Sequence, residues 1–310
     1  MLKPKRRSQW ACLSAMPEQL SHSTILEHGL GDVSLMRFND TREAEPILCP
    51  DLIAIEEPLL LNLTSYCPKQ QCYQTRQLSL TMRTPGDDLA LVIGLLFSQN
   101  IISRLDEIEA LQFVSEADAT LNQTNHIEVQ LVKGLVPDWS ILQRNFASYS
   151  SCGLCGKSSV QALALSHQAS IDCRAEWLDE QLLYQLPSQL QGLQTLYPQT
   201  GAVHGAGYFA DQQWLIVEED IGRHNAVDKV LGQLLLQDCY SERSVLVLSG
   251  RVSFELMQKV VRANIPVVVA VGAPSSLALA VARQFNISLI GFTKTKQFNV
   301  YHAPWRIKYK

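Results

Sequence analysis

Two cysteines, Cys152 and Cys155, are spaced as C-x-x-C in the stretch Ser-Ser-Cys-Gly-Leu-Cys-Gly-Lys-Ser-Ser. The apolar run 160–165 follows them and predicts a helix, so the pair lies close to a helix start. At such a start, unpaired backbone N–H groups and the positive end of the helix dipole stabilise a thiolate, the reactive form of cysteine. The neighbouring glycines allow a tight turn and leave the sulfur atoms unshielded. This pair can therefore carry sulfur, hold a metal ion or exchange electrons.

The residues around the pair favour some of these chemistries over others. A structural zinc site usually needs a second ligand pair at matching spacing, and Cys67 and Cys72 supply only a looser pair in another part of the chain. A thioredoxin-like redox pair would follow a βαβ pattern, which does not precede this stretch. An inert buried pair is disfavoured, because the flanking serines and glycines are not typical of a core. A sulfur-carrying thiol needs an exposed cysteine on a flexible loop, and this stretch provides one.

The triplet His126-Ile127-Glu128 followed by C-x-x-C is superficially similar to the ligand pattern of the zinc deaminases. His126 lies in an alternating strand pattern, however, in which neighbouring side chains point to opposite faces. Ser151 also stands where the deaminase pattern has proline. We therefore predict no metal site.

A second group of polar residues surrounds a predicted helix start in the segment 219–229. Arginine and lysine suit phosphate and asparagine suits a base edge or a ribose, so their combination indicates a ligand site. In another segment, His204 lies between glycines that permit close approach of a ligand, although a core position is an equally good interpretation. The candidate binding residues in these polar segments are His204, Arg223, His224, Asn225, Lys229 and Arg251.

The composition and charge of the chain limit the classes of protein to which it can belong. Its 310 residues are long enough for two domains, and a hydrophobic fraction of 46% supplies a sizeable core. The net charge of −4 argues against a general nucleic-acid-binding protein. The eight cysteines are scattered, and neither a signal peptide nor a membrane-spanning apolar run is visible. We therefore expect a soluble cytoplasmic protein with reduced thiols.

The first half of the chain predicts a loosely ordered leader over residues 1–45 and a small α+β domain over residues 46–145. Apolar runs and alternating patterns predict strands over residues 52–55, 58–63, 77–83, 110–114 and 126–132. A Thr-Pro-Gly-Asp-Asp motif breaks the pattern, and Asp87 or Asp88 is expected to cap a helix over the apolar run 89–96. A link to the cysteine pair is expected from residue 137 to residue 149.

The second half predicts an α/β domain over residues 146–310. Leucines indicate one or two helices between residues 176 and 196, with an interruption at Pro187. After them, short apolar strands alternate with amphipathic helices, which is typical of a layered sheet buried on both faces. The expected strands cover residues 214–217, 245–248, 267–271 and 289–292, and the expected helices cover 225–236, 254–262 and 277–285. In such sheets ligands lie beyond the strand ends, here at the polar loops 218–224, 249–251 and 272–276.

Six motifs together resemble the FdhD family of sulfurtransferase accessory proteins, which are required for active formate dehydrogenase. They are RTPGDD at 83–88, SCGLCG at 151–156, TGAVH at 200–204, EDIGRHNAVDK at 219–229, SGRVSFE at 249–255 and FNVY at 298–301. The eleven-residue motif is very specific. The resemblance extends from about residue 50 to residue 303, so it covers both predicted domains.

The resemblance implies a reaction and a fold. The family takes sulfane sulfur from a cysteine desulfurase, holds it as a persulfide on the CxxC loop and passes it to the molybdenum cofactor destined for formate dehydrogenase. That cofactor is the bis(molybdopterin guanine dinucleotide) form, Mo-bis-MGD. The C-terminal domain is expected to resemble the cytidine deaminase fold without its zinc, and the protein is expected to form homodimers. The alternative is a non-catalytic chaperone that binds this cofactor and uses the cysteines for contact only.

The resemblance also implies roles for individual residues. Cys152 matches the cysteine that carries the persulfide, and Cys155 would assist or relay the sulfur. The cofactor-binding segment of the family matches Phe298, Asn299, Val300, Tyr301, His302 and Ala303. The six polar candidates named above would then contact phosphate and guanine. The chain departs from the family at Lys294, where arginine is common and a bidentate phosphate contact is lost, and at 98–100, where a Glu-Gly pair is usual.

Overall fold

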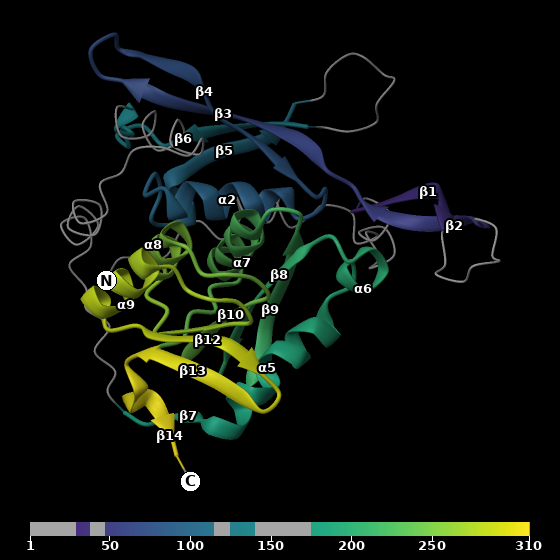
Figure 1. The fold of residues 1–310 in the computed structure, drawn as a ribbon. Helices are drawn as coiled ribbons and strands as arrows, with labels where there is room; N and C mark the ends of the chain where they lie inside the picture. Colours follow the sequence, from purple (N-terminus) through teal and green to yellow (C-terminus); the bar gives the residue numbers. More distant parts are fainter. Residues whose placement is uncertain (1–28, 38–46, 115–124, 140–174, 310) are drawn as a thin grey trace.

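The computed structural model describes residues 29–37, 47–114, 125–139 and 175–309 (Figure 1). Within these residues the chain has the mixed α/β architecture predicted from its sequence, with its strands in four sheets. Most of the predicted leader and the loop with Cys152 and Cys155 lie outside the described residues. No helix in the described ranges is long and apolar enough to cross a membrane.

Four of the five strands predicted in the first half form a four-stranded sheet in the order β4-β3-β6-β5, whereas the strand predicted over residues 52–55 belongs to a separate two-stranded sheet. The four strands and a 3-10 turn that precedes β5 are β3 (Glu57–Cys67), β4 (Cys72–Arg83), η2 (Leu105–Glu107), β5 (Ile108–Phe113) and β6 (His126–Leu131). Side chains along β3 alternate in burial, because one face of the sheet packs on helix α2 (Asp88–Ser98). The other side of α2 contacts α7 (Arg223–Gln237), so α2 is buried from residue 90 to residue 97.

The start of α2 corrects the prediction that Asp87 or Asp88 caps this helix. Asp87 occupies the N-cap position, but its backbone is left-handed (φ 54°) and its side chain makes no capping hydrogen bond. Asp88 instead pairs with Arg83, whose Nε and Nη2 each donate to a carboxylate oxygen at 2.9 Å. This bidentate pair fixes the end of β4 against the first turn of α2.

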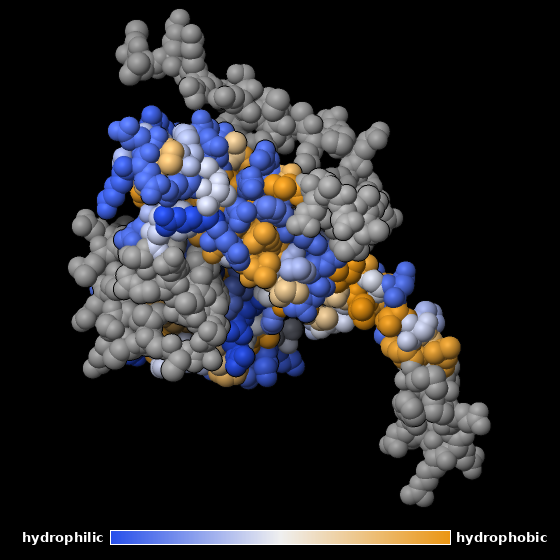
Figure 2. Space-filling view, turned by 90° about the horizontal axis from the view of Figure 1, so that it is seen from above, coloured by the Kyte–Doolittle hydropathy of each residue, from blue (hydrophilic) through white to orange (hydrophobic). Residues whose placement is uncertain are grey.

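Part of the predicted leader is a strand. β1 (Leu30–Arg37) pairs antiparallel with β2 (Ile47–Ala54), so the prediction of a loosely ordered leader is wrong for residues 30–37. The two strands form a ribbon that projects from the body, with exposed apolar residues such as Leu48 and Ile53 along it (Figure 2). The pairing partner, rather than an apolar pattern of its own, makes β1 a strand.

The second half forms a six-stranded sheet in the order β13-β12-β11-β10-β8-β9. Three central strands are mutually parallel, namely β10 (Ser244–Leu248), β11 (Val267–Ala270) and β12 (Ser288–Lys294). The other three run antiparallel to their neighbours, namely β8 (His204–Ala210), β9 (Gln213–Asp220) and β13 (Gln297–His302). The four strands expected from apolar runs are confirmed, whereas β8 and β13 were not predicted as strands.

Helices cover both faces of this sheet, as expected for strands that are apolar on both sides. One face packs on α7, α8 (Phe254–Arg262) and α9 (Ser276–Phe285), and the other on α5 (Glu180–Leu193). The remaining short elements are β7 (Leu178–Asp179), α6 (Tyr197–Thr200), η3 (Pro304–Arg306) and β14 (Ile307–Lys308). Because α2 packs on α7, the two predicted domains share one apolar core. Their boundary near residue 146 and the likeness to cytidine deaminases stay predictions.

Helix α5 continues through Pro187, so the expected interruption at this proline is wrong. Proline removes one backbone hydrogen bond from a helix interior and favours a break. Here the leucines Leu183, Leu186 and Leu190 lie on one side of the helix and are fully buried against the sheet. These leucines pack on the sheet both before and after the proline, and this packing stabilises the helix by more than the lost hydrogen bond costs.

Candidate functional site

Several polar loops meet at the end of the large sheet where the parallel strands β10 and β11 finish. β8 runs antiparallel to β10, so its first residue, His204, lies at this same end. The N–H of Gly205 donates to Ser249 Oγ at 2.9 Å, and the N–H of Ser249 donates to the Gly205 carbonyl at 3.0 Å. The loop after β10 is therefore fastened beside His204, at the sheet end where α/β proteins bind their ligands.

Glycines let the successive loops approach one another closely along this sheet end. The N–H of Gly272, after β11, donates to the Gly250 carbonyl at 3.1 Å. A Cβ at Gly272 would lie 2.8 Å from that carbonyl oxygen, so only glycine fits there. A Cβ at Gly291 in β12 would lie 3.0 Å from the Gly272 carbonyl oxygen and 3.2 Å from the ring of Tyr301. We call the line of residues His204, Gly250, Gly272, Gly291 and Tyr301 the strand-end row.

Basic side chains gather at the His204 end of this row. His204 is half-buried, and its pKa is lowered first by burial and then by electrostatic interaction with Arg223 and His224, with Arg251 adding to the effect. Four of the six polar candidates therefore lie close together, although they come from different segments of the sequence. We call His204, Arg223, His224 and Arg251 the basic cluster. Such a cluster of cationic and neutral donors suits an anionic ligand such as a phosphate.

The imidazole of His224 is oriented by side chains at the N-terminal end of α8, including its N-cap residue. Its Nε2 lies 2.9 Å from Glu255 Oε2 and 3.3 Å from Ser253 Oγ. The hydrogen bond from His224 is the main cause that lowers the pKa of the Glu255 carboxyl. Beside it, Arg223 Nε is buried and has no hydrogen-bond partner among the described residues. A buried guanidinium nitrogen without an acceptor is an expected feature of a site whose ligand supplies one.

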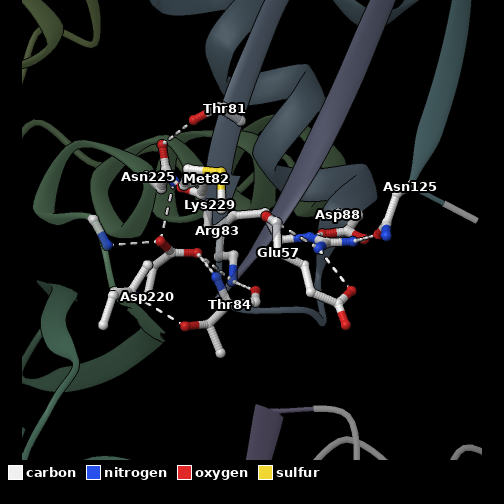
Figure 3. Close-up of polar contacts among 12 residues, drawn as sticks. Glu57, Thr81, Met82, Arg83, Thr84, Asp88, Asn125, Asp220, Asn225 and Lys229 are labelled. Atoms are coloured by element: carbon white, nitrogen blue, oxygen red, sulfur yellow. Dashed lines mark hydrogen bonds and ion pairs between the residues drawn. The ribbon is translucent and has the colours of Figure 1, made fainter. Parts of the chain in front are cut away.

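Two of the six candidates, Lys229 and Asn225, have structural partners instead (Figure 3). Lys229 is buried, pairs with Asp220 at 3.0 Å and donates to the backbone carbonyl of Thr84 at 3.0 Å. Asn225 Nδ2 donates to the carbonyl of Met82 at 2.8 Å and to Asp220 Oδ1 at 3.0 Å. Both side chains thus fasten the end of β4 to β9 and α7. The roles of Lys229 as a phosphate ligand and of Asn225 as a base or ribose ligand stay predictions.

The predicted cofactor-binding segment, residues 298–303, is divided between two faces of the edge strand β13. Phe298 packs on Tyr184 of α5, with ring centroids 4.9 Å apart, and Val300 lies in the same apolar cluster. Tyr301 packs on the opposite side, against the core under α8 and α9, and is the residue of this segment that reaches the strand-end row.

The remaining residues of that segment have different environments. Asn299 is exposed and pairs in register with Gly291, so its side chain is free to meet a ligand near the row. His302 is partly buried, with its ring centroid 5.5 Å from that of Trp305. Ala303 is fully buried with a left-handed backbone (φ 55°), so it shapes the chain rather than presenting a side chain.

Phe292 is a residue of this region that the sequence did not reveal. Its backbone is left-handed (φ 52°), which is costly for a bulky residue, and the residue is 41% exposed. Its N–H donates to the Gly272 carbonyl at 3.2 Å, so it adjoins the strand-end row. In the sequence it follows an apolar strand pattern, which gives no sign of this conformation. An exposed aromatic ring held in a strained conformation is a candidate for stacking on a planar ligand.

We predict that the pKa of His204 rises when Arg223 is replaced by alanine. The largest cause that lowers this pKa is burial, which the substitution leaves unchanged. The second cause is the positive charge of Arg223, which the substitution removes. Loss of that charge makes the imidazolium more favourable. An NMR titration of the histidine ring protons measures the change, with the His204 signal assigned by its loss in His204→Gln.

Arg283→Ala is the matched control for this titration. Burial lowers the pKa of His302 most, and the positive charge of Arg283 lowers it further, whereas the charges that shift the pKa of His204 are those of other residues. We expect the control to raise the pKa of His302 and to leave that of His204 unchanged. An unaltered His204 titration in Arg223→Ala would contradict the proposed cluster.

The cysteine pair Cys152 and Cys155, predicted to be the catalytic part of the site, lies outside the described residues. Within the described ranges, no group of three or more histidine, cysteine, aspartate or glutamate residues is arranged to hold a metal ion. The described part of the candidate site therefore consists of the strand-end row and the basic cluster.

Comparisons with known proteins agree with the motifs found in the sequence. The model of the FdhD/NarQ family matches residues 67–308. The sulfur carrier protein FdhD of Streptomyces avermitilis is 39% identical over 83% of this chain and 89% of its own length. That of Thermoplasma acidophilum is 36% identical over 94% and 99%. The crystal structure of a formate dehydrogenase accessory protein from Desulfotalea psychrophila has a similar fold, with a TM-score of 0.64 at 24% identity over 90% of this chain and 98% of that one.

Proposed function

Because this chain belongs to the FdhD/NarQ family, we propose that it is a sulfur carrier for the maturation of a formate dehydrogenase. The observation that carries the proposal is the similarity to curated relatives named sulfur carrier protein FdhD, at 36–39% identity over most of the chain. The C-x-x-C pair supplies the thiol that such a carrier needs, and the basic cluster supplies a binding surface for an acceptor.

The sulfur is held on Cys152 in this proposal. The Cys152 thiolate attacks the outer sulfur of a persulfide on a cysteine desulfurase, so that a new S–S bond forms and the old one breaks. The desulfurase cysteine leaves as a thiolate and takes up a proton. The outer sulfur then passes to the acceptor as sulfane sulfur, so that the S–S bond to Cys152 breaks and the Cys152 sulfur leaves as a thiolate. Cys155, three residues further along the chain, would assist or relay this sulfur.

The proposed acceptor is the substrate Mo-bis-MGD, and the described residues fit its chemical groups. Its phosphates suit His204, Arg223 and Arg251, of which Arg223 carries a buried Nε without a partner among the described residues. Its planar guanine suits the exposed ring of Phe292 or the ring of Tyr301 beside the glycines. In this proposal the chain forms a homodimer and acts in the cytoplasm.

We expect the purified chain to gain the mass of one sulfur atom when it is incubated with a cysteine desulfurase and cysteine. Intact mass spectrometry measures the gain, which a thiol reductant should remove because the added sulfur is held in an S–S bond. The gain should disappear in Cys152→Ala. The matched control is Cys239→Ala, since burial raises the pKa of the Cys239 thiol and disfavours its reactive thiolate.

The outcomes of this experiment separate the proposed functions. A wild-type chain that gains no sulfur would contradict the carrier and favour the chaperone, which the basic cluster also supports. Stoichiometric zinc on the purified chain, lost in Cys152→Ala, would instead assign the cysteine pair to a structural metal site.

A further inference from the structure

A second pair of cysteines lies at the tip of the β3–β4 hairpin. Cys67 is the last residue of β3 and Cys72 is the first residue of β4, and the two are direct cross-strand partners. The turn 68–71 joins them. Figure 1 shows this hairpin extending beyond the helices of the body. Neither cysteine belongs to the C-x-x-C motif or to the strand-end row, so an inference about this pair does not rest on the proposed function.

Side-chain contacts hold the register that places the two cysteines opposite each other. The rings of Tyr66 and Tyr73, the next pair along the hairpin, meet edge to face with centroids 5.5 Å apart. The hydroxyl oxygens of Thr64 and Thr75 lie 2.7 Å apart in a further cross-strand pair. A slip of one residue would move every side chain to the other face, and these contacts oppose it. The two thiols therefore stay on the same face of the hairpin.

The position of the pair is compatible with a disulfide bond. Directly opposite residues in antiparallel strands have Cα atoms about 4.5–5.5 Å apart, within the range of about 4.4–6.8 Å that disulfides require. Both thiols are free in the structure, Cys72 is exposed and Cys67 is partly buried. Cys72 is therefore the thiol that a dissolved reagent meets first, and Cys67 is the thiol positioned to resolve the product.

We propose that Cys67 and Cys72 form a reversible disulfide by exchange with a small-molecule disulfide such as glutathione disulfide. The Cys72 thiolate attacks one sulfur of the reagent, forming a mixed disulfide and releasing one glutathione thiol. The Cys67 thiolate then attacks the Cys72 sulfur and releases the second glutathione. Two cysteine thiols are oxidised to one disulfide, the reagent is reduced to two thiols, and the two protons pass to the released glutathiones.

The sequence allows a direct test because Lys69 lies between the two cysteines. Trypsin cleaves after Lys69, which places Cys67 in the peptide 43–69 and Cys72 in the peptide 70–76. The full chain is equilibrated with glutathione and glutathione disulfide, its remaining thiols are blocked with N-ethylmaleimide, and it is digested without reductant. We expect the two peptides to be joined, with a mass lower by two hydrogen atoms than their sum, and to separate on reduction.

Variants identify the sulfur atoms in the linkage. The peptide 43–69 also contains Cys49, a partly buried cysteine of β2, so Cys49→Ser is the matched control and should keep the joined peptides. Cys67→Ser should remove them. If the wild-type peptide 70–76 carries only maleimide or glutathione at every glutathione ratio, or if the linkage survives in Cys67→Ser, the proposal is overturned.

Discussion

Formate dehydrogenase activity should fall to the background of cells that lack this chain when Cys152 is replaced by alanine. In the proposed mechanism the transferred sulfur is bonded to the Cys152 sulfur between donor and acceptor, and alanine offers no atom to hold it. A variant that only bound the acceptor more weakly would keep part of the formate dehydrogenase activity. A variant without the sulfur atom that carries the transferred sulfur should keep none above the background. Formate oxidation in complemented cells measures the effect, with the amounts of both proteins checked by immunoblotting.

The control for this experiment is Cys239→Ala, which removes a thiol without touching the proposed route. Cys239 is partly buried beside the apolar core, and burial raises the pKa of its thiol. Cells with this variant should keep normal formate oxidation. If Cys152→Ala also keeps it, while formate dehydrogenase is present at its usual amount, the chaperone function becomes the better explanation.

Local patterns in the sequence were sufficient to predict most strands of the large sheet and the helices that follow them. The strands β9 to β12 and the helices α7 to α9 were predicted because each is a short apolar or amphipathic run flanked by polar loops. β8 was missed because two glycines, Gly205 and Gly207, dilute its apolar pattern. A Cβ on the second of these would lie 2.5 Å from the ring of Trp214, so the need for glycine there comes from a neighbouring strand. Such a requirement is invisible in the local sequence.

Only part of the candidate site could be predicted, because the sequence does not show which side chains meet in the fold. His204, Arg223, His224 and Arg251 come together because the strand ends that carry them meet at one edge of the sheet, as the α/β pattern implies. Lys229 has the same chemistry as a phosphate ligand, but its partner carbonyl, on Thr84, lies 145 residues earlier in the chain. Side-chain type predicts what a group can bind, whereas the partner that it does bind depends on tertiary contacts.

The crossing of α2 and α7 leads to the largest effect on stability that we expect. A Cβ on Gly94 of α2 would lie 1.8 Å from the backbone carbonyl oxygen of Asp228 in α7. Reciprocally, a Cβ on Gly232 of α7 would lie 1.9 Å from the carbonyl oxygen of Ala90 in α2. The two backbones are thus in contact through two glycines, and neither helix can retreat without leaving the core that its other side fills.

Gly94→Ala should therefore destabilise the fold by about 3 kcal/mol, at the upper end of the usual cost of overpacking, because the obstacle is backbone and cannot rotate away. Urea unfolding followed by circular dichroism measures the loss. The same substitution at Gly192 is the matched control, since this residue lies in helix α5 and an added Cβ there would have no atom within 4 Å apart from its chain neighbours and the backbone of its own helix. There, alanine should stabilise by about 0.5–1 kcal/mol, because it restricts the unfolded chain and suits a helix. Equal unfolding midpoints for Gly94→Ala and wild type would mean that the helices are not in backbone contact.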